Sequence, residues 1–125
     1  MNTLIYYDVE LIVMAGWMKI VTPFFINKFK NKIINIHPSL LPAYKGGTAI
    51  NDTILNGSKI TGCSVHFVEE EVDSGSLIMQ AALSIRDDDD IESLSKRIHM
   101  LEHKILPHSI SYVGFLIRSN VMENC

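Results

Sequence analysis

The fold of this chain is decided by one stretch, Ile33-Ile34-Asn35-Ile36-His37-Pro38-Ser39-Leu40-Leu41-Pro42. Its β-branched residues predict a strand that ends at Pro38, because proline has no backbone N–H with which to extend a central ladder. Asn35 and His37 lie two residues apart, so their side chains leave the same face of that strand. An amide donor and an imidazole therefore lie together at the carboxyl end of a strand, where open α/β sheets bind ligands.

The preceding segment predicts a parallel strand and a crossover helix. Residues 10–16 form a short continuous apolar run, which is typical of a strand buried on both faces. Thr22-Pro23 is a helix start, and the helix is expected to run to about Lys30. Strand, helix and strand make a βαβ unit, which brings Gly16 to the same edge of the sheet as residues 35–37.

The next segment predicts a helix and an antiparallel hairpin. Residues 49–56 read as a helix that ends at Gly57. Residues 62–68 and 77–85 read as strands, joined by an acidic turn over residues 69–75. Strands joined by so short a loop are expected to be neighbours and antiparallel.

A long helix is expected to close the chain. Asp89 and Glu92 have the spacing of a capping box, and Pro107 is expected to kink or break the helix before a second segment that runs to about Arg118. The apolar residues predicted to face the core are Ile91, Leu94, Ile98, Leu101 and Ile105.

Composition limits the fold class and the environment. A length of 125 residues and 47% apolar content predict a single domain over residues 1–125, with a Rossmann-like open α/β sheet of parallel strands, an antiparallel C-terminal hairpin and a long C-terminal helix. The net charge of −3 favours neither nucleic acid nor membrane as a partner. Cys63 and Cys125 make no disulfide framework, so two free thiols and a cytoplasmic location are expected.

Several motifs in fixed order resemble the formyltransferase family. The motifs are Asn35-Ile36-His37-Pro38-Ser39-Leu40-Leu41-Pro42, Gly62-Cys63-Ser64-Val65-His66-Phe67-Val68, Val72-Asp73-Ser74-Gly75 and Leu101-Glu102-His103-Lys104-Ile105-Leu106-Pro107. Residues 14–20 are similar to the family's folate-pocket segment, and the resemblance extends over about residues 9–117. Within the family, the motifs most resemble members that transfer a formyl group from 10-formyltetrahydrofolate to the amine of glycinamide ribonucleotide in de novo purine biosynthesis.

The resemblance implies a site made of small-molecule contacts without a metal. Asn35 and His37 would donate hydrogen bonds to the oxyanion of a tetrahedral intermediate, while Asp73 would keep the imidazole charged and help to move the amine proton. The folate co-substrate would contact Met18, Lys19, Ile20, Val21, Val72 and Asp73. The ribonucleotide substrate would contact Gly16, Met18, Asn35, Pro38 and Glu102.

The chain departs from the family's pattern at its N-terminus. Family members carry a first strand and a glycine-rich turn that holds the ribonucleotide phosphate, and no such turn precedes Gly16. The chain is therefore expected to be a fragment or a natural truncation that lacks a βαβ piece of roughly 60–80 residues. A parallel strand at residues 10–16 without that neighbour invites edge pairing, so a homodimer or aggregation is expected.

Rival functions stay open from the residues alone. A formyltetrahydrofolate deformylase would use water in place of the amine, although Glu102 favours the ribonucleotide enzyme. The acidic charge and short chain argue against a formyltransferase that acts on tRNA. A non-catalytic folate-binding fragment is the remaining alternative.

Other polar residues have simpler interpretations than a site. His99 and His103 have the spacing of a helical metal pair, but a solvated helix face is favoured. Cys63 is expected to be buried as a small apolar residue. His66 is placed by the resemblance near the co-substrate, and core packing explains it equally well. Residues 87–90 are interpreted as a helix cap in preference to a cation site.

Overall fold

The computed structural model describes residues 11–15, 23–29, 31–69 and 75–123. Its strands are β1 (Ile12–Ala15), β2 (Ile33–His37), β3 (Ile60–Phe67) and β4 (Leu77–Ser84), and they form one sheet in the order β1-β2-β3-β4. Its helices are α1 (Pro23–Lys28), α2 (Ala49–Leu55) and α3 (Ile91–Glu123). The strands and helices expected from the sequence are therefore present in the described residues, with slightly different ends.

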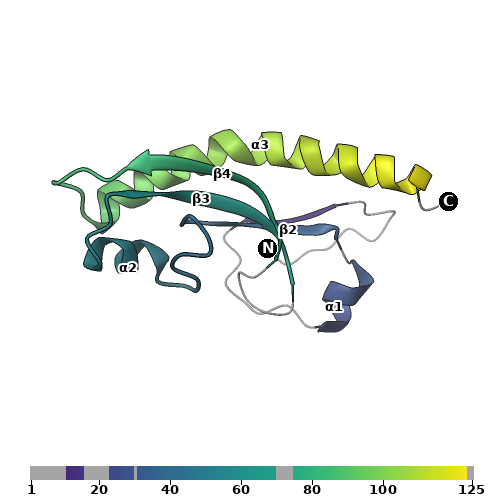
Figure 1. Cartoon of the computed structure of the whole chain (residues 1–125), viewed down its shortest axis with the longest axis horizontal. Helices are drawn as coiled ribbons and strands as arrows, with labels where there is room; N and C mark the ends of the chain where they lie inside the picture. The colour runs from purple at the N-terminus through teal and green to yellow at the C-terminus, as the bar shows by residue number, and fades with distance from the viewer. Residues whose placement is uncertain (1–10, 16–22, 30, 70–74, 124–125) are drawn as a thin grey trace.

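The pairing of the strands confirms a mixed α/β sheet. β1 pairs with β2 in parallel through the crossover helix α1, whereas β2 with β3 and β3 with β4 are antiparallel. In Figure 1, α3 runs along the sheet beside β3 and β4, and α1 lies on the opposite side of the strands from α3. The parallel βαβ unit thus meets the antiparallel hairpin where β2 pairs with β3, at the centre of the sheet.

The core lies between α3 and one face of β2 and β3. The two central strands contribute Ile34, Ile36, Cys63 and Val65, while α3 contributes Leu94, Ile98, Ile105 and Val113. Two predictions of burial are wrong. Ile91 is 49% exposed, because it is the first residue of α3 and lies beyond the apolar contacts of the helix. Val13 is 38% exposed, because β1 has a strand partner on one side alone in the described part of the sheet.

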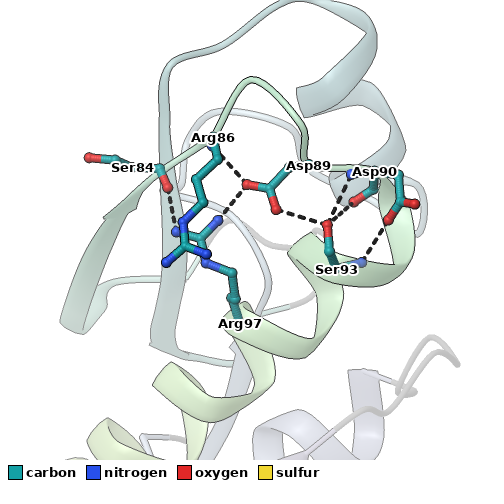
Figure 2. Close-up of polar contacts among 6 residues, drawn as sticks. All are labelled: Ser84, Arg86, Asp89, Asp90, Ser93 and Arg97. Atoms are coloured by element: carbon teal, nitrogen blue, oxygen red, sulfur yellow. Dashed lines mark hydrogen bonds and ion pairs between the residues drawn. The ribbon is translucent and has the colours of Figure 1, made fainter.

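The start of α3 is capped by a different pair of residues from the predicted Asp89 and Glu92. Asp90 Oδ1 accepts a hydrogen bond from Ser93 N at 2.8 Å, and Ser93 Oγ accepts one from Asp90 N at 3.0 Å, as Figure 2 shows. This reciprocal arrangement satisfies two backbone donors at the end of the helix. The prediction had the right kind of cap, one residue too early.

Asp89 instead joins the end of β4 to α3. Its carboxylate accepts a hydrogen bond from Arg86 N at 2.7 Å and pairs with the guanidinium of Arg97 (Figure 2). Arg97 Nη2 also donates to the carbonyl of Ser84 at 2.6 Å. These contacts hold the pKa of Asp89 below its usual value, chiefly through the Arg86 backbone hydrogen bond. The connection between β4 and α3 is therefore held by one ion pair and two hydrogen bonds, which we call the Asp89 brace.

Pro107 does not break α3, which continues through it to Glu123 (Figure 1). The residue is exposed, and so is His103 one turn earlier, whose carbonyl would have accepted the missing N–H. On this solvent side water can satisfy that carbonyl, so the proline costs the helix less than it would on the buried side. None of the helices in the described residues has the length and apolar character needed to cross a membrane.

Candidate active site

Four polar side chains gather on the face of β2 and β3 opposite the core. Asn35 pairs across the strands with His66, and His37 pairs with Ser64. Directly paired residues of antiparallel strands project to the same face, and so do residues two apart on one strand. Asn35, His37, Ser64 and His66 therefore share one face, at the end of the parallel strands β1 and β2 that open α/β folds use for ligands.

The amide of Asn35 has a fixed orientation. Its Oδ1 accepts a hydrogen bond from the backbone N of Ile36 at 2.9 Å. Because the oxygen is held against the backbone, the Nδ2 group is the part of the side chain directed away from that contact. Nδ2 carries two N–H donors, which are the groups needed beside a developing oxyanion.

The imidazole of His37 is buried and held by the loop that follows β2. His37 is 5% exposed, and its Nε2 lies 2.8 Å from the carbonyl oxygen of Tyr44. A carbonyl oxygen only accepts hydrogen bonds, so Nε2 is the donor in this contact. Tyr44 has a φ of 53°, in the left-handed region that costs a non-glycine residue about 1–2 kcal/mol.

Glu102 brings α3 to the same neighbourhood. It is half-buried, and its carboxylate lies within electrostatic reach of His37, His99 and His103. Burial raises the pKa of Glu102, and the three histidines oppose that rise. His99 Nε2 also lies 3.9 Å from Glu102 Oε1. The carboxylate of Glu102 on α3 is therefore within electrostatic reach of His37, and its contact with the ribonucleotide remains a prediction.

The remaining polar candidates have structural surroundings. His66 is 2% exposed, and its Nδ1 lies 2.9 Å from the carbonyl of Phe67. Cys63 is fully buried, and this burial, with the charge of Glu102, raises the pKa of its thiol to about 12. The expectation that Cys63 is buried is confirmed. Within the described ranges no group of three or more His, Cys, Asp or Glu side chains could hold a metal ion.

Several predicted site residues lie outside the described residues. They are Gly16, Met18, Lys19, Ile20, Val21, Val72 and Asp73. Their roles remain predictions. Pro38 is described, half-buried directly after His37.

Sequence reasoning missed the side chains that hold the loop after β2. These are Ser39, Tyr44, Ser64 and Gln80, which are joined by hydrogen bonds within the loop and to β3 and β4. The spacing of Ser64 and His66 on one strand was the only signal available. Which loop atoms they meet depends on the fold of residues 38–44.

Comparison with known proteins agrees with this geometry. A model of the formyl transferase family matches residues 1–110. The chain is 50% identical over 113 residues to the trifunctional purine biosynthetic protein adenosine-3 of Chironomus tentans, covering 90% of this chain and 8% of that protein. It is 43% identical over 104 residues to the phosphoribosylglycinamide formyltransferase of Bacillus subtilis, covering 83% of this chain and 53% of that enzyme.

A solved structure has the same arrangement of the backbone. The crystal structure of phosphoribosylglycinamide formyltransferase from Anaplasma phagocytophilum superposes with a TM-score of 0.81 at 44% identity, over 83% of this chain and 51% of that one. The chain belongs to the formyl transferase family. It spans about half the length of the bacterial relatives named here and 8% to 11% of the trifunctional ones.

Proposed function

We propose that the chain is the folate-binding, catalytic part of an enzyme that transfers a formyl group from 10-formyltetrahydrofolate to the amine of glycinamide ribonucleotide, in de novo purine biosynthesis. One observation supports this above all others. Asn35 and His37 share one face at the end of β2, with Asn35 Oδ1 turned to the backbone and His37 Nε2 held by Tyr44. The names of the relatives support the choice of the ribonucleotide as acceptor.

The chemistry requires hydrogen-bond donors at a developing negative charge. The amine nitrogen attacks the formyl carbon, a new C–N bond forms, and the carbonyl oxygen becomes an oxyanion. Asn35 Nδ2 and the imidazolium of His37 donate to that oxygen. The intermediate then collapses, the bond from carbon to N10 breaks, and the proton lost by the amine reaches N10 through water held by Asp73.

Binding of the two small molecules is assigned from the family resemblance. Met18, Lys19, Ile20, Val21 and Val72 would surround the pterin of the co-substrate. Gly16, Pro38 and Glu102 would contact the ribonucleotide. No metal takes part in the proposed reaction.

We infer that residues 1–125 act as one catalytic domain whose activity depends on a phosphate-binding portion such as the longer relatives supply. The test is spectrophotometric turnover of 10-formyltetrahydrofolate with glycinamide ribonucleotide, using this chain and a form extended by the N-terminal portion of the Bacillus subtilis enzyme. We expect turnover with the extended form. Formate release that does not depend on the amine would identify a deformylase instead, and folate binding without turnover in either form would identify a binding fragment.

We further propose that the chain alone forms a homodimer through the side of β1 that has no strand partner among the described residues. Val13 on β1 is 38% exposed, and a mostly apolar cavity of about 450 Å³ lies between Leu11 and the residues of α3 around Phe115. An exposed edge with an adjoining apolar hollow favours association. Light scattering should give the mass of a dimer for the natural chain and of a monomer for Val13→Lys, whereas Phe24→Lys, at an exposed site on α1, should remain a dimer.

A further inference from the structure

The loop after β2 is attached to the antiparallel hairpin through one serine hydroxyl. Ser64 Oγ donates to the carbonyl of Ser39 at 2.7 Å and accepts from the backbone N of Leu41 at 3.0 Å. It also accepts from Nε2 of Gln80, on β4, at 2.9 Å. One donated and two accepted hydrogen bonds use the whole capacity of a hydroxyl, and Ser64 is fully buried.

Gln80 makes a second attachment to the same loop. Its Nε2 donates to the carbonyl of Leu41 at 3.0 Å as well as to Ser64. Leu41 is therefore held through both its N–H and its carbonyl by side chains of β3 and β4. A shift of residues 39–41 would break the two buried hydrogen bonds to Ser64 and the one that Gln80 donates to Leu41.

The far end of the loop holds the ring of His37. Within the loop Ser39 Oγ donates to the carbonyl of Ala43 at 2.6 Å, which sets the turn that leads into Tyr44. The phenol of Tyr44 lies 2.7 Å from Ser58 Oγ, so this residue is anchored from both its side chain and its carbonyl. The carbonyl accepts the hydrogen of His37 Nε2, so in the neutral imidazole Nδ1 carries the lone pair.

We propose that Ser64 and Gln80 are positioning residues for His37, acting through the loop of residues 38–44. They hold the carbonyl of Tyr44 where it selects the Nε2–H form of the imidazole and turns Nδ1 towards the substrates. The catalytic meaning of this arrangement rests on the proposed function, but the hydrogen bonding of the ring does not. Neither residue touches a reacting atom in this scheme.

The test reads the imidazole directly in the complete chain. Nitrogen-15 NMR of the histidine rings measures the ratio of Nδ1–H to Nε2–H in neutral His37. We expect neutral His37 to be in the Nε2–H form in the natural chain. In Ser64→Ala and Gln80→Met the ratio of Nδ1–H to Nε2–H should rise about fivefold, which is the scale of one neutral hydrogen bond. Ser64→Thr keeps a hydroxyl and should restore the natural ratio. Ser84→Ala, at the last residue of β4, is the matched control.

A second measurement separates positioning from general loss of structure. In the extended, active form the two variants should lower kcat about tenfold, as expected for a displaced catalytic group, with little change in KM for either substrate. Gln80 lies on the exposed edge of the sheet, so Gln80→Met remains informative if Ser64→Ala does not fold.

Two results would overturn different statements. Variants that keep both the natural ring form and the natural kcat refute the positioning role, whatever reaction the enzyme catalyses. A natural chain that holds His37 as Nε2–H, with no formyl transfer in the extended form, refutes the proposed function and leaves the hydrogen-bond assignment standing.

Discussion

The two faces of β2 and β3 are made from alternate residues of the same two strands, and they have opposite characters. One face presents Ile34, Ile36, Cys63 and Val65 to α3 and belongs to the core. The other carries Asn35, His37, Ser64 and His66. Residues of the core and residues of the candidate site therefore alternate along each strand. Substitutions on the two faces should therefore change different measurements.

Substitutions on the polar face should have the largest effect, and that effect should be on activity. In the extended form, His37→Ala and Asn35→Ala should each lower kcat about 10²–10³-fold, because under the proposed function each removes a donor to the oxyanion. Thermal melting of these variants should change far less than turnover. His108→Ala, at an exposed position of α3, serves as the control and should retain full activity. If His37→Ala leaves turnover unchanged, the polar face is not where the reaction takes place.

A substitution against the apolar face should affect stability first. Leu94 is fully buried on α3, and Leu94→Ala should lower the free energy of unfolding by about 3 kcal/mol, because it leaves a cavity in the core. Urea unfolding followed by circular dichroism measures this change. Met100→Ala, at a residue of the same helix that is 64% exposed, should change it by less than about 0.5 kcal/mol. A fall in turnover per folded molecule of Leu94→Ala would mean that the two faces are coupled.

The Asp89 brace between β4 and α3 predicts that the stability of the fold depends on pH. The pKa of Asp89 is lowered in the folded chain, so its contribution is present above the unfolded pKa of about 4 and is lost as the pH falls through the lower folded value. The melting temperature of the natural chain should decrease when the pH is lowered below about 4. Asp89→Asn should show a smaller fall over the same range, whereas Asp88→Asn should behave like the natural chain. Equal acid dependence in all three chains would exclude this role for Asp89.

The smallest effect concerns the reactivity of Cys63 at the centre of the apolar face. Its thiol is fully buried and its pKa is raised to about 12, so almost no thiolate forms at pH 8. Iodoacetamide should therefore leave the peptide that contains Cys63 unmodified in the folded chain, and alkylate it in guanidinium. Peptide mass spectrometry reads both states. Rapid labelling of the folded chain would show that this face of β3 opens readily.

Much of the fold could be predicted because its signals are local. Periodic apolar residues located the strands and helices, and Pro38 and Gly57 marked ends of elements that the structure has close to those positions. Pairing of β3 with β4 followed from the short connection between them. The errors arose where the outcome depends on surroundings. Val13 is exposed because β1 has a strand partner on one side alone in the described part of the sheet, and Pro107 is tolerated because it faces solvent.

The candidate site could be predicted in part for the same reason. Asn35 and His37 are two residues apart on one strand, so their shared face is a property of the backbone repeat. The contacts of Ser64 and Gln80 with residues 39–41 join segments 23 to 39 residues apart, and no sequence pattern specifies them. The capping box was displaced by one residue because Asp89, Asp90 and their neighbours offer similar carboxylates, and the position of Arg97 decides between them.

The sequence by itself determined that a strand ends at Pro38 with an amide and an imidazole on one face, because strand periodicity and the missing proline N–H are local properties. It also determined the alternation that separates core from site on β2 and β3. Tertiary structure alone decided that the Tyr44 carbonyl receives the hydrogen of His37 Nε2, and that Glu102 comes within electrostatic reach of the same ring. The physical reason is distance along the chain: a hydrogen bond or a charge contact between remote segments exists only after the sheet and α3 have brought them together.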